Sequence, residues 1–477
     1  MYRNAKNVGY YMIGKGALAQ LGDLLTTRRE AQDGPAVFFL DHYFEGKGLA
    51  DRLPVENQDM VLYVDTTEEP TTDSVDGYTA RAKEFLGGKM PCALLAFGGG
   101  STLDTCKCVG NLLTNPGKAE DYQGWELVKH PAPYKIAVPT LSGTGSETSR
   151  TGIICNEAKN LKLGMNSDYT MFDQVLLDPD LTASVPRNQY FYTGIDTYMH
   201  CFESLSGSYR NVVVDSLAEK AIDICKRVFL SDDMMSDENR ELMMIASFLG
   251  GMAAGFVGVV HPVSAGLSIV LHMPHGLANC HALSVLEDIY PTEYRDFMAM
   301  IERQGIDLPK GICQGLSDAQ YTALYEASIV HEKPLINRLG PDFKKILTKE
   351  NVIGRFKKME RSICHFLQLA ALSMLSLSVR RQRRQRLKQT RFLFRSWTKR
   401  VHSRHKKFVC AKASWAVGGR PQQPIVLAGG KKISNAVFSN LPWRVRWTSR
   451  SISADAPSAI RKRKSPWSWR PCATPIL

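Results

Sequence analysis

One carboxylate and three imidazoles in this sequence have the types and spacing of metal ligands. Asp196 and His200 lie four residues apart in TGIDTYMHCFES, which places both side chains on one face of a helix. His261 and His275 follow in VVHPVSAGLSIVLHMPHG, a segment that also contains His272. Neutral imidazoles with one carboxylate suit Fe(II) or Zn(II) better than Mg²⁺ or Ca²⁺. Taken singly, these residues also fit structural roles, and for His272 alone the structural role is favoured.

A first glycine-rich loop, FGGGSTLD, has the composition of a phosphate cradle. It follows an apolar segment that predicts a strand and opens a segment that predicts a helix. Glycine lets the backbone approach a phosphate closely, and a helix N-terminus supplies N–H donors. The hydroxyl residues of this loop could cap the helix and also donate to phosphate. An ordinary strand–helix turn explains the loop about equally well by itself. The expected cradle residues are Gly98, Gly99, Gly100, Ser101 and Thr102.

A second loop, PTLSGTGSE, again follows an expected strand and is rich in glycine and hydroxyl groups. Its candidate cofactor contacts are Thr140, Ser142 and Thr144. Two such loops at the carboxyl ends of strands favour a dinucleotide crevice. Asp41, at the end of an earlier strand, could accept hydrogen bonds from an adenosine ribose, and its charge would favour NAD over NADP. A solvated loop aspartate is the plainer alternative.

The order of apolar and amphipathic segments predicts two structural halves. Short apolar segments that predict strands alternate with helical patterns such as residues 77–86, which is typical of a parallel α/β domain. The predicted strands are 36–40, 61–64, 92–97 and 136–138, and the later predicted helices are 216–228, 239–260 and 293–303. We therefore expect a dinucleotide-binding α/β domain over residues 1–180 and an all-helical domain over residues 181–359.

The net charge of +13 on the 477 residues is unevenly distributed. Residues 361–477 contain 26 Lys and Arg and one acidic residue, which leaves 34 basic and 46 acidic residues before them. Six of the seven tryptophans also lie in this tail. We expect residues 360–477 to be disordered, and translation past a lost stop codon in a wrong frame explains their composition best. A basic surface that binds nucleic acid or anionic lipid, and a short membrane segment at 363–379, are the alternatives.

The remaining features favour a cytoplasmic protein. The N-terminus lacks the apolar core of a secretory signal, and the first 360 residues contain no apolar run long enough to span a membrane. The eleven cysteines are scattered without a zinc or redox pattern, which favours reduced thiols. We expect no membrane association and no specific nucleic-acid partner.

Residues 1–359 resemble the iron-containing (group III) alcohol dehydrogenase family. Its GGGSxxDxxK pattern matches from Gly98 through Asp104 to Lys107, and its PTxxGTGSE pattern matches residues 139–147. The resemblance implies a dinucleotide-binding domain, a helical domain, and cofactor roles for Asp104 and Lys162. It also implies a metal held by Asp196, His200, His261 and His275. By analogy with the family, a homodimer is possible.

One departure from the family pattern concerns proton transfer. Many relatives carry HxxxH at the first histidine, whereas this chain has Ala265 at the second position. His272 is then the nearest candidate proton relay. Several segments, including TYMHCFES, resemble a sugar-acid branch that includes 3-deoxy-manno-octulosonate 8-oxidase, an enzyme of amino-sugar lipopolysaccharide synthesis. A sugar-acid carboxylate would need a cation, for which Arg150 and Arg210 are the candidates.

The resulting hypothesis is a metal- and NAD-dependent oxidoreductase that oxidises the primary hydroxyl of a small alcohol to an aldehyde. The substrate expected from the branch resemblance is the C8 hydroxyl of the sugar acid. A simple alcohol or polyol dehydrogenase is the alternative within the family. A binding protein that works through the basic tail is the alternative from another class.

Overall fold

The computed structural model describes residues 6–254, 257–360, 416–417 and 420–421. The chain forms two units, residues 1–369 and residues 370–477. In the second unit the described residues form one antiparallel pair, β10 (Ala416–Val417) with β11 (Arg420–Pro421). The predicted membrane segment at 363–379 falls outside the described residues, and so do the remaining residues of the predicted disordered tail after 360. None of the described helices combines the length and apolar character that a membrane-spanning helix needs.

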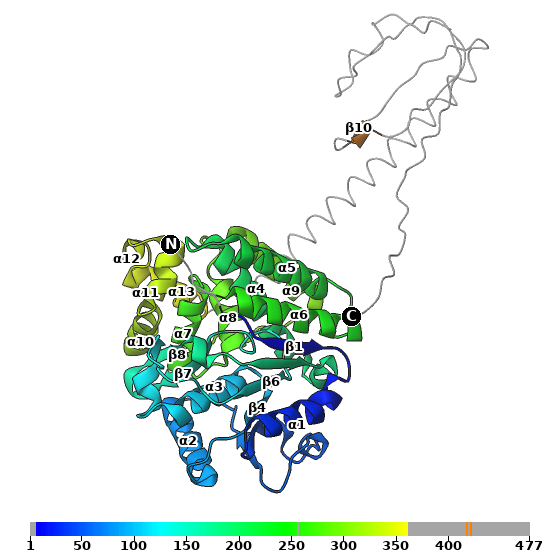
Figure 1. The fold of residues 1–477 in the computed structure, drawn as a ribbon. Coiled ribbons are helices and arrows are strands. Elements are labelled where there is room, and N and C mark those ends of the chain that lie inside the picture. The colour runs from blue at the N-terminus through cyan, green and yellow to red at the C-terminus, as the bar shows by residue number, and fades with distance from the viewer. Residues whose placement is uncertain (1–5, 255–256, 361–415, 418–419, 422–477) are drawn as a thin grey trace, which may run out of the picture. The chain divides into compact units, whose positions relative to one another are not determined.

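The first unit begins with a parallel six-stranded sheet in the order β1-β9-β6-β4-β2-β3 (Figure 1). The strands are β1 (Tyr10–Ile13), β2 (Ala36–Asp41), β3 (Met60–Val64), β4 (Ala93–Gly98), β6 (Lys135–Pro139) and β9 (Gln174–Leu177). β2 is buried on both faces, because Val37 packs with the α2 and α3 side and Phe38 with the α1 side. The covering helices are α1 (Leu21–Ala31), α2 (Thr72–Leu86) and α3 (Gly100–Thr114). The four predicted strands are confirmed, and helix 77–86 is part of α2.

A smaller sheet extends the nucleotide half. Its strands are β5 (Gly124–Trp125), β7 (Thr151–Asn156) and β8 (Leu161–Asn166), in the order β5-β8-β7. β7 and β8 pair in antiparallel fashion across a turn at Asn160, whose φ is 49°. This hairpin was not predicted from the sequence, nor were β1 and β9. It matters for the site because it brings Lys162 toward the helical half.

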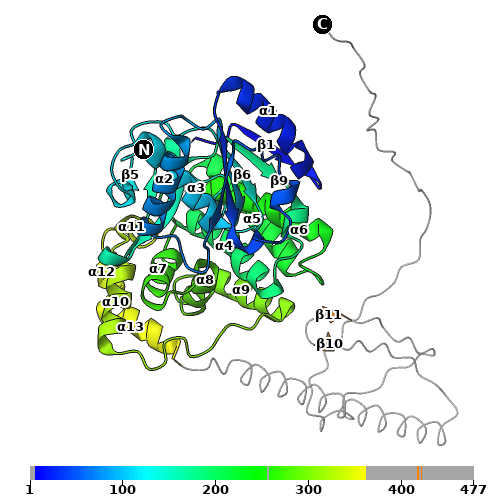
Figure 2. The same cartoon turned by 90° about the horizontal axis from the view of Figure 1, so that it is seen from below.

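The second half of the unit is helical, and Figure 2 shows it packed below the sheet half. Its helices are α4 (Arg187–Ser206), α5 (Val212–Phe229), α6 (Asp237–Ala253), α7 (Val260–Leu271), α8 (His275–Ser284), α9 (Pro291–Gln304), α10 (Asp318–Ile329), α11 (Glu332–Leu339), α12 (Phe343–Ile346) and α13 (Lys349–Lys358). The predicted helices 216–228 and 293–303 are confirmed within α5 and α9. The prediction of one helix over 239–260 is wrong, because α6 ends at Ala253 and α7 begins at Val260. Gly255 and Gly258 in the GFVGV segment between them are poor helix formers.

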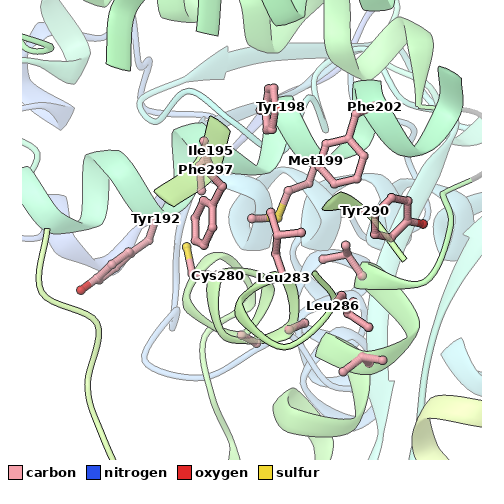
Figure 3. Packing of buried hydrophobic residues seen from close by; sticks show 14 of the residues in the cluster. Tyr192, Ile195, Tyr198, Met199, Phe202, Cys280, Leu283, Leu286, Tyr290 and Phe297 are labelled. Carbon is pink, nitrogen blue, oxygen red and sulfur yellow. The ribbon is translucent and has the colours of Figure 1, made fainter. Parts of the chain in front are cut away.

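The core of the helical half fixes the position of α4. Figure 3 shows Ile195, Met199 and Phe202 on one side of α4, facing Cys280, Leu283 and Leu286. All six side chains belong to one buried cluster. This packing leaves the opposite face of α4 to carry polar side chains.

Candidate metal centre

The polar face of α4 carries the first two candidate ligands. Asp196, His200 and Glu203 are spaced i, i+4 and i+7 along the helix, and Asp196 and Glu203 are fully buried. The carboxylate of Asp196 lies 3.8 Å from Nδ1 of His200. A buried carboxylate needs compensating partners, so this face of α4 must meet other polar groups.

The third candidate ligand comes from the first turn of α7. Nε2 of His261 lies 3.2 Å from Oδ1 of Asp196, and its Nδ1 lies 2.5 Å from Oε2 of Glu203. The other oxygen of Glu203 accepts a hydrogen bond of 2.6 Å from the backbone N–H of Val260. Glu203 thus fixes the imidazole so that Nδ1 is occupied and Nε2 faces Asp196, an arrangement that metal-ligating histidines commonly use.

The fourth candidate ligand, His275, is the first residue of α8. Its Nε2 lies 3.7 Å from Oδ2 of Asp196 and 3.2 Å from Nδ2 of Asn279. Nδ2 of Asn279 also lies 2.7 Å from Oδ1 of Asp196. The predicted set of one aspartate and three histidines is therefore brought together from α4, α7 and α8.

The geometry and electrostatics of these four residues fit a metal ion. Their candidate ligand atoms all lie within 4.8 Å of one another. Ligand bonds of about 2 Å separate the atoms around one ion by roughly 3 to 4 Å, and the distances of 3.2, 3.7 and 3.8 Å fall in that range. Oδ2 of Asp196 and Nδ1 of His200 are buried and accept no hydrogen bond from the described residues.

The pKa shifts of His200, His275 and Asp196 support the same conclusion. Burial lowers the pKa of His200 to about 4 and that of His275 to about 3, so both rings are neutral, as ligation requires. Burial also acts to lower the pKa of His261, but the carboxylates of Glu203 and Asp196 outweigh it and raise the value to about 9, so His261 carries a proton near neutral pH that a metal ion would displace on binding. For Asp196, burial raises the pKa, whereas the surrounding imidazoles, led by His200, bring it well below its usual range. The carboxylate is therefore ionised.

The two glycine-rich loops lie side by side at the carboxyl ends of β4 and β6. A Cβ on Gly100 would come within 2.8 Å of Cγ2 of Thr144, so the close approach of the loops requires glycine there. α3 begins at Gly100 with Gly99 as its N-cap and has no side-chain cap. The prediction that Ser101 or Thr102 caps this helix is therefore wrong: the N-cap is Gly99, two residues before Ser101, and the helix N-terminus remains available to an anion.

The second loop also joins the two halves of the unit. Gly143 has φ of 153°, and a Cβ there would lie 1.8 Å from the carbonyl oxygen of Thr193 in α4. Oγ1 of Thr197 donates a 2.8 Å hydrogen bond to the carbonyl of Gly143. The helix that carries Asp196 and His200 thus packs directly on the loop expected to hold the cofactor.

One cavity of about 1750 Å³ contains both sets of residues. It is lined by the four candidate ligands and by eight of the predicted cofactor contacts: Asp41, Gly99, Gly100, Ser101, Asp104, Thr140, Thr144 and Lys162. The volume exceeds the roughly 300 to 1,000 Å³ of an ordinary ligand pocket, leaving room for a dinucleotide and a second molecule.

Comparison with known proteins agrees with this architecture. Residues 9–179 match the model of iron-containing alcohol dehydrogenase, and residues 190–304 match that of the Fe-containing alcohol dehydrogenase family, C-terminal. The chain is 32% identical over 295 residues to the probable alcohol dehydrogenase EutG of Salmonella typhimurium, covering 59% of this chain and 73% of that protein. The chain belongs to the iron-containing alcohol dehydrogenase family.

Two further members of the family are similar to this chain. Sulfoacetaldehyde reductase of Bilophila wadsworthia is 34% identical over 237 residues, which are 49% of this chain and 60% of the reductase. The crystal structure of sulfoacetaldehyde reductase from Bifidobacterium kashiwanohense in complex with NAD⁺ has a TM-score of 0.63 at 20% identity and covers 76% of this chain and all of that one. This likeness shows the expected fold, a parallel α/β half followed by a helical half.

Within this family fold, three predicted cofactor residues lie behind the cavity wall. Gly98, Thr102 and Ser142 do not line the cavity, although Oγ1 of Thr102 and Oγ of Ser142 are buried and lack a partner among the described residues. Asp104 lines it, but its carboxylate is engaged by Ser146 at 2.6 Å and by the backbone N–H of Ile153 at 3.1 Å. Its position favours a role in holding the loops together.

The predicted proton relay and the candidate cations lie at the cavity wall. His272 is exposed and groups with Glu68 and Glu157, separately from the four-ligand cluster. Arg150 is ion-paired with Asp168 at 2.9 Å and with Glu126, and Arg210 is paired with Asp215 at 3.0 Å. Both arginines are therefore already ion-paired, which weakens the prediction that one of them binds a substrate carboxylate.

Three residues of the site were not found from the sequence. Glu203 and Glu69 contact the ligand-bearing helices α7 and α8. His331 lines the cavity, and burial lowers its pKa to about 4, so its ring is neutral. Glu203 lies three residues after His200, so helical spacing offered a signal for it. No short-range pattern marked the other two.

Proposed function

We propose that this protein is a metal- and NAD-dependent oxidoreductase that interconverts a primary alcohol and an aldehyde. The observation that carries the proposal is that one cavity contains both the Asp/His cluster and the two glycine-rich loops. A bound Fe(II) or Zn(II) supplies Lewis acidity to a substrate hydroxyl, and NAD supplies the hydride acceptor. The family assignment and the NAD⁺ complex of a structural neighbour support this reading.

The residues of the chain provide binding and orientation. Asp196, His200, His261 and His275 would hold the metal, and the uncapped N-terminus of α3 would bind the dinucleotide phosphates. Thr197 holds the second loop against α4, so the loop expected to bind the dinucleotide and the helix that carries Asp196 and His200 are joined by a direct hydrogen bond.

For the substrate we propose a sugar acid, with the C8 hydroxyl of 3-deoxy-manno-octulosonate as the group oxidised. Support comes from the resemblance of TYMHCFES and neighbouring segments to the sugar-acid branch. The similarity to sulfoacetaldehyde reductase suggests a smaller anionic aldehyde as the competing substrate. Simple alcohols are the third class.

The test combines metal analysis with turnover of the full chain. We expect one Fe or Zn per chain, quenching or enhancement of NADH fluorescence on binding, and NAD-dependent oxidation of 3-deoxy-manno-octulosonate. Reduction of sulfoacetaldehyde, or oxidation of simple diols, in place of the sugar acid would retain the general activity and contradict the substrate. Absence of both metal and cofactor binding would contradict the activity itself.

His272 remains our proposed proton relay, and substitution tests it. His272→Ala should lower kcat by about a hundredfold or more and alter the pH profile, because general acid–base groups contribute that much. The comparison variant is His331→Ala, which removes the buried neutral imidazole of the same cavity. Little loss with His272→Ala would contradict the proposed relay, and a large loss with His331→Ala in the same experiment would transfer the role to that residue.

A further inference from the structure

The helix that carries His275 begins on a carboxylate from the nucleotide half. α8 starts at His275, and its N-cap, Pro274, provides no side-chain hydrogen bond. Oε1 of Glu69 accepts a 2.8 Å hydrogen bond from the backbone N–H of His275. Glu69 lies 206 residues earlier in the chain, in the loop after β3. A carboxylate at a helix N-terminus is stabilised by the free N–H groups and by the helix dipole.

The second oxygen of Glu69 binds Lys162. The distance from Oε2 of Glu69 to Nζ of Lys162 is 3.2 Å, and Nζ also lies 3.4 Å from Oγ of Ser268 in α7. Glu69 and Lys162 both belong to the nucleotide half, whereas Ser268 and His275 belong to the helices that carry two of the metal ligands. The Glu69–Lys162 ion pair thus contacts both helices: Lys162 contacts α7 and Glu69 contacts α8.

The ion pair is largely removed from water. Lys162 is 7% exposed, and the side chain of Glu69 is 19% exposed. Burial alone raises the pKa of Glu69, but Lys162 and the contact with His275 outweigh this and lower it below its ordinary value. The carboxylate is therefore charged, and screening by salt is weak at this depth.

The same loop reaches the expected cofactor position. Oγ1 of Thr66 donates a 2.9 Å hydrogen bond to Oδ1 of Asp41, the residue predicted to bind the adenosine ribose. Asp41, Thr66, Glu69 and Lys162 all line the cavity. A molecule bound against Asp41 and Lys162 would therefore contact the segment that holds His275.

Glu203 provides an instructive comparison. It supports the first turn of α7 as Glu69 supports that of α8, but it comes from α4, within the helical half. Glu69 is the carboxylate that connects a ligand-bearing helix to the nucleotide half. Substitution of Glu69 should therefore change the coupling between dinucleotide binding and metal binding, as well as the metal affinity itself.

We propose that Glu69 is a positioning residue that couples dinucleotide binding to metal binding. This inference rests on the proposed function. Dinucleotide bound against Asp41 and Lys162 stabilises the loop of residues 65–70 in the arrangement seen here, in which Glu69 holds α8 and keeps His275 in its candidate ligand position. Linkage requires the effect to be reciprocal, so metal strengthens dinucleotide binding by the same factor.

The experiment measures the NADH dissociation constant of the full chain with and without Zn(II), by nicotinamide fluorescence. In the unsubstituted protein we expect Zn(II) to tighten NADH binding by about fivefold or more. In Glu69→Ala we expect this factor to fall below about twofold and the Zn(II) dissociation constant, from chelator competition, to rise by about tenfold. Glu120→Gln is the matched control, because it breaks an exposed Glu–Lys pair with Lys159 of 2.8 Å outside the cavity.

The results of this experiment distinguish a failure of the proposed coupling from a failure of the proposed function. Unchanged coupling in Glu69→Ala overturns the inference, as does an unsubstituted protein that binds both groups independently. A protein that binds neither Zn(II) nor NADH instead overturns the proposed function. If Glu69→Ala does not fold, Glu69→Gln retains an acceptor for His275 but loses the charge opposite Lys162, and it should reduce the coupling partially. Full coupling in that variant would overturn the inference.

Discussion

Asp196→Ala should abolish metal binding and lower kcat/KM by about a thousandfold or more. Asp196 is the one residue of this cluster that offers a carboxylate. Its oxygens lie within 3.8 Å of a ring nitrogen of each of the three histidines. Without it, three imidazole nitrogens would face a divalent cation with no carboxylate among its ligands. Loss of a Lewis acid worth several kcal/mol of transition-state stabilisation corresponds to about three powers of ten in rate.

The measurement is metal content per chain together with NAD-dependent turnover. Asp223→Ala is the control, since Asp223 is an exposed carboxylate on α5. Asp196→Asn preserves the side-chain volume and separates loss of charge from loss of packing. Turnover within tenfold of the unsubstituted protein in both Asp196 variants would show that the cluster holds no catalytic metal.

The sequence allowed prediction of the sheet strands β2, β3, β4 and β6 and of the clustering of Asp196, His200, His261 and His275 for clear physical reasons. Strands buried on both faces, such as β2 and β4, have continuous apolar segments that end at loop residues. Asp196 and His200 lie on one helix, so their i, i+4 spacing placed them together in advance. Spacing could not group His261 and His275 with them, because these histidines come from separate helices. The family resemblance is what placed them in the same cluster.

The supporting residues could not be predicted in the same way. The contact between Glu69 and His275 spans 206 residues, and that between Glu203 and His261 spans 58. Such contacts depend on how the halves pack, which no local period encodes. β1 was missed because it is a short and largely exposed strand, and the β7–β8 hairpin was missed because its strands, although mostly buried, mix polar and glycine residues with apolar ones. The break between α6 and α7 was missed because apolar periodicity continues through the glycines.

For the expected cofactor contacts, the sequence predicted the loops but not the direction of every side chain. Gly98, Thr102 and Ser142 were assigned from the composition of their loops, yet these residues lie outside the cavity lining. A motif identifies the segment that approaches a ligand, but the direction of each side chain depends on where the helix begins. Here α3 begins at Gly100, which turns Thr102 into the core, where it is fully buried.

Glu203→Gln should weaken metal binding by ten- to a hundredfold. In the native arrangement Oε2 of Glu203 accepts a hydrogen bond from Nδ1–H of His261, which leaves Nε2 to ligate. The backbone N–H of Val260 and the hydroxyl of Tyr290 occupy Oε1. A glutamine would use its carbonyl oxygen for these two donors and turn its NH₂ group toward His261.

That amide would then donate to Nδ1, which must become the acceptor. The proton of the neutral imidazole would move to Nε2, the atom that faces Asp196, and a protonated nitrogen cannot bind a metal. Glu203→Gln changes the size of the side chain very little, so the expected loss comes from the tautomer and not from a cavity. Tyr290→Phe removes one donor to the same carboxylate and should have a smaller effect in the same direction.

Chelator competition and metal titration measure the change, with Glu219→Gln on the exposed face of α5 as the control. High metal concentration should restore much of the turnover of Glu203→Gln, because the four ligands are still present, whereas it should restore none in Asp196→Ala. An unchanged metal dissociation constant in Glu203→Gln would mean that the tautomer of His261 is fixed by other contacts. The contrast between rescue and no rescue separates a residue that orients a ligand from one that is a ligand.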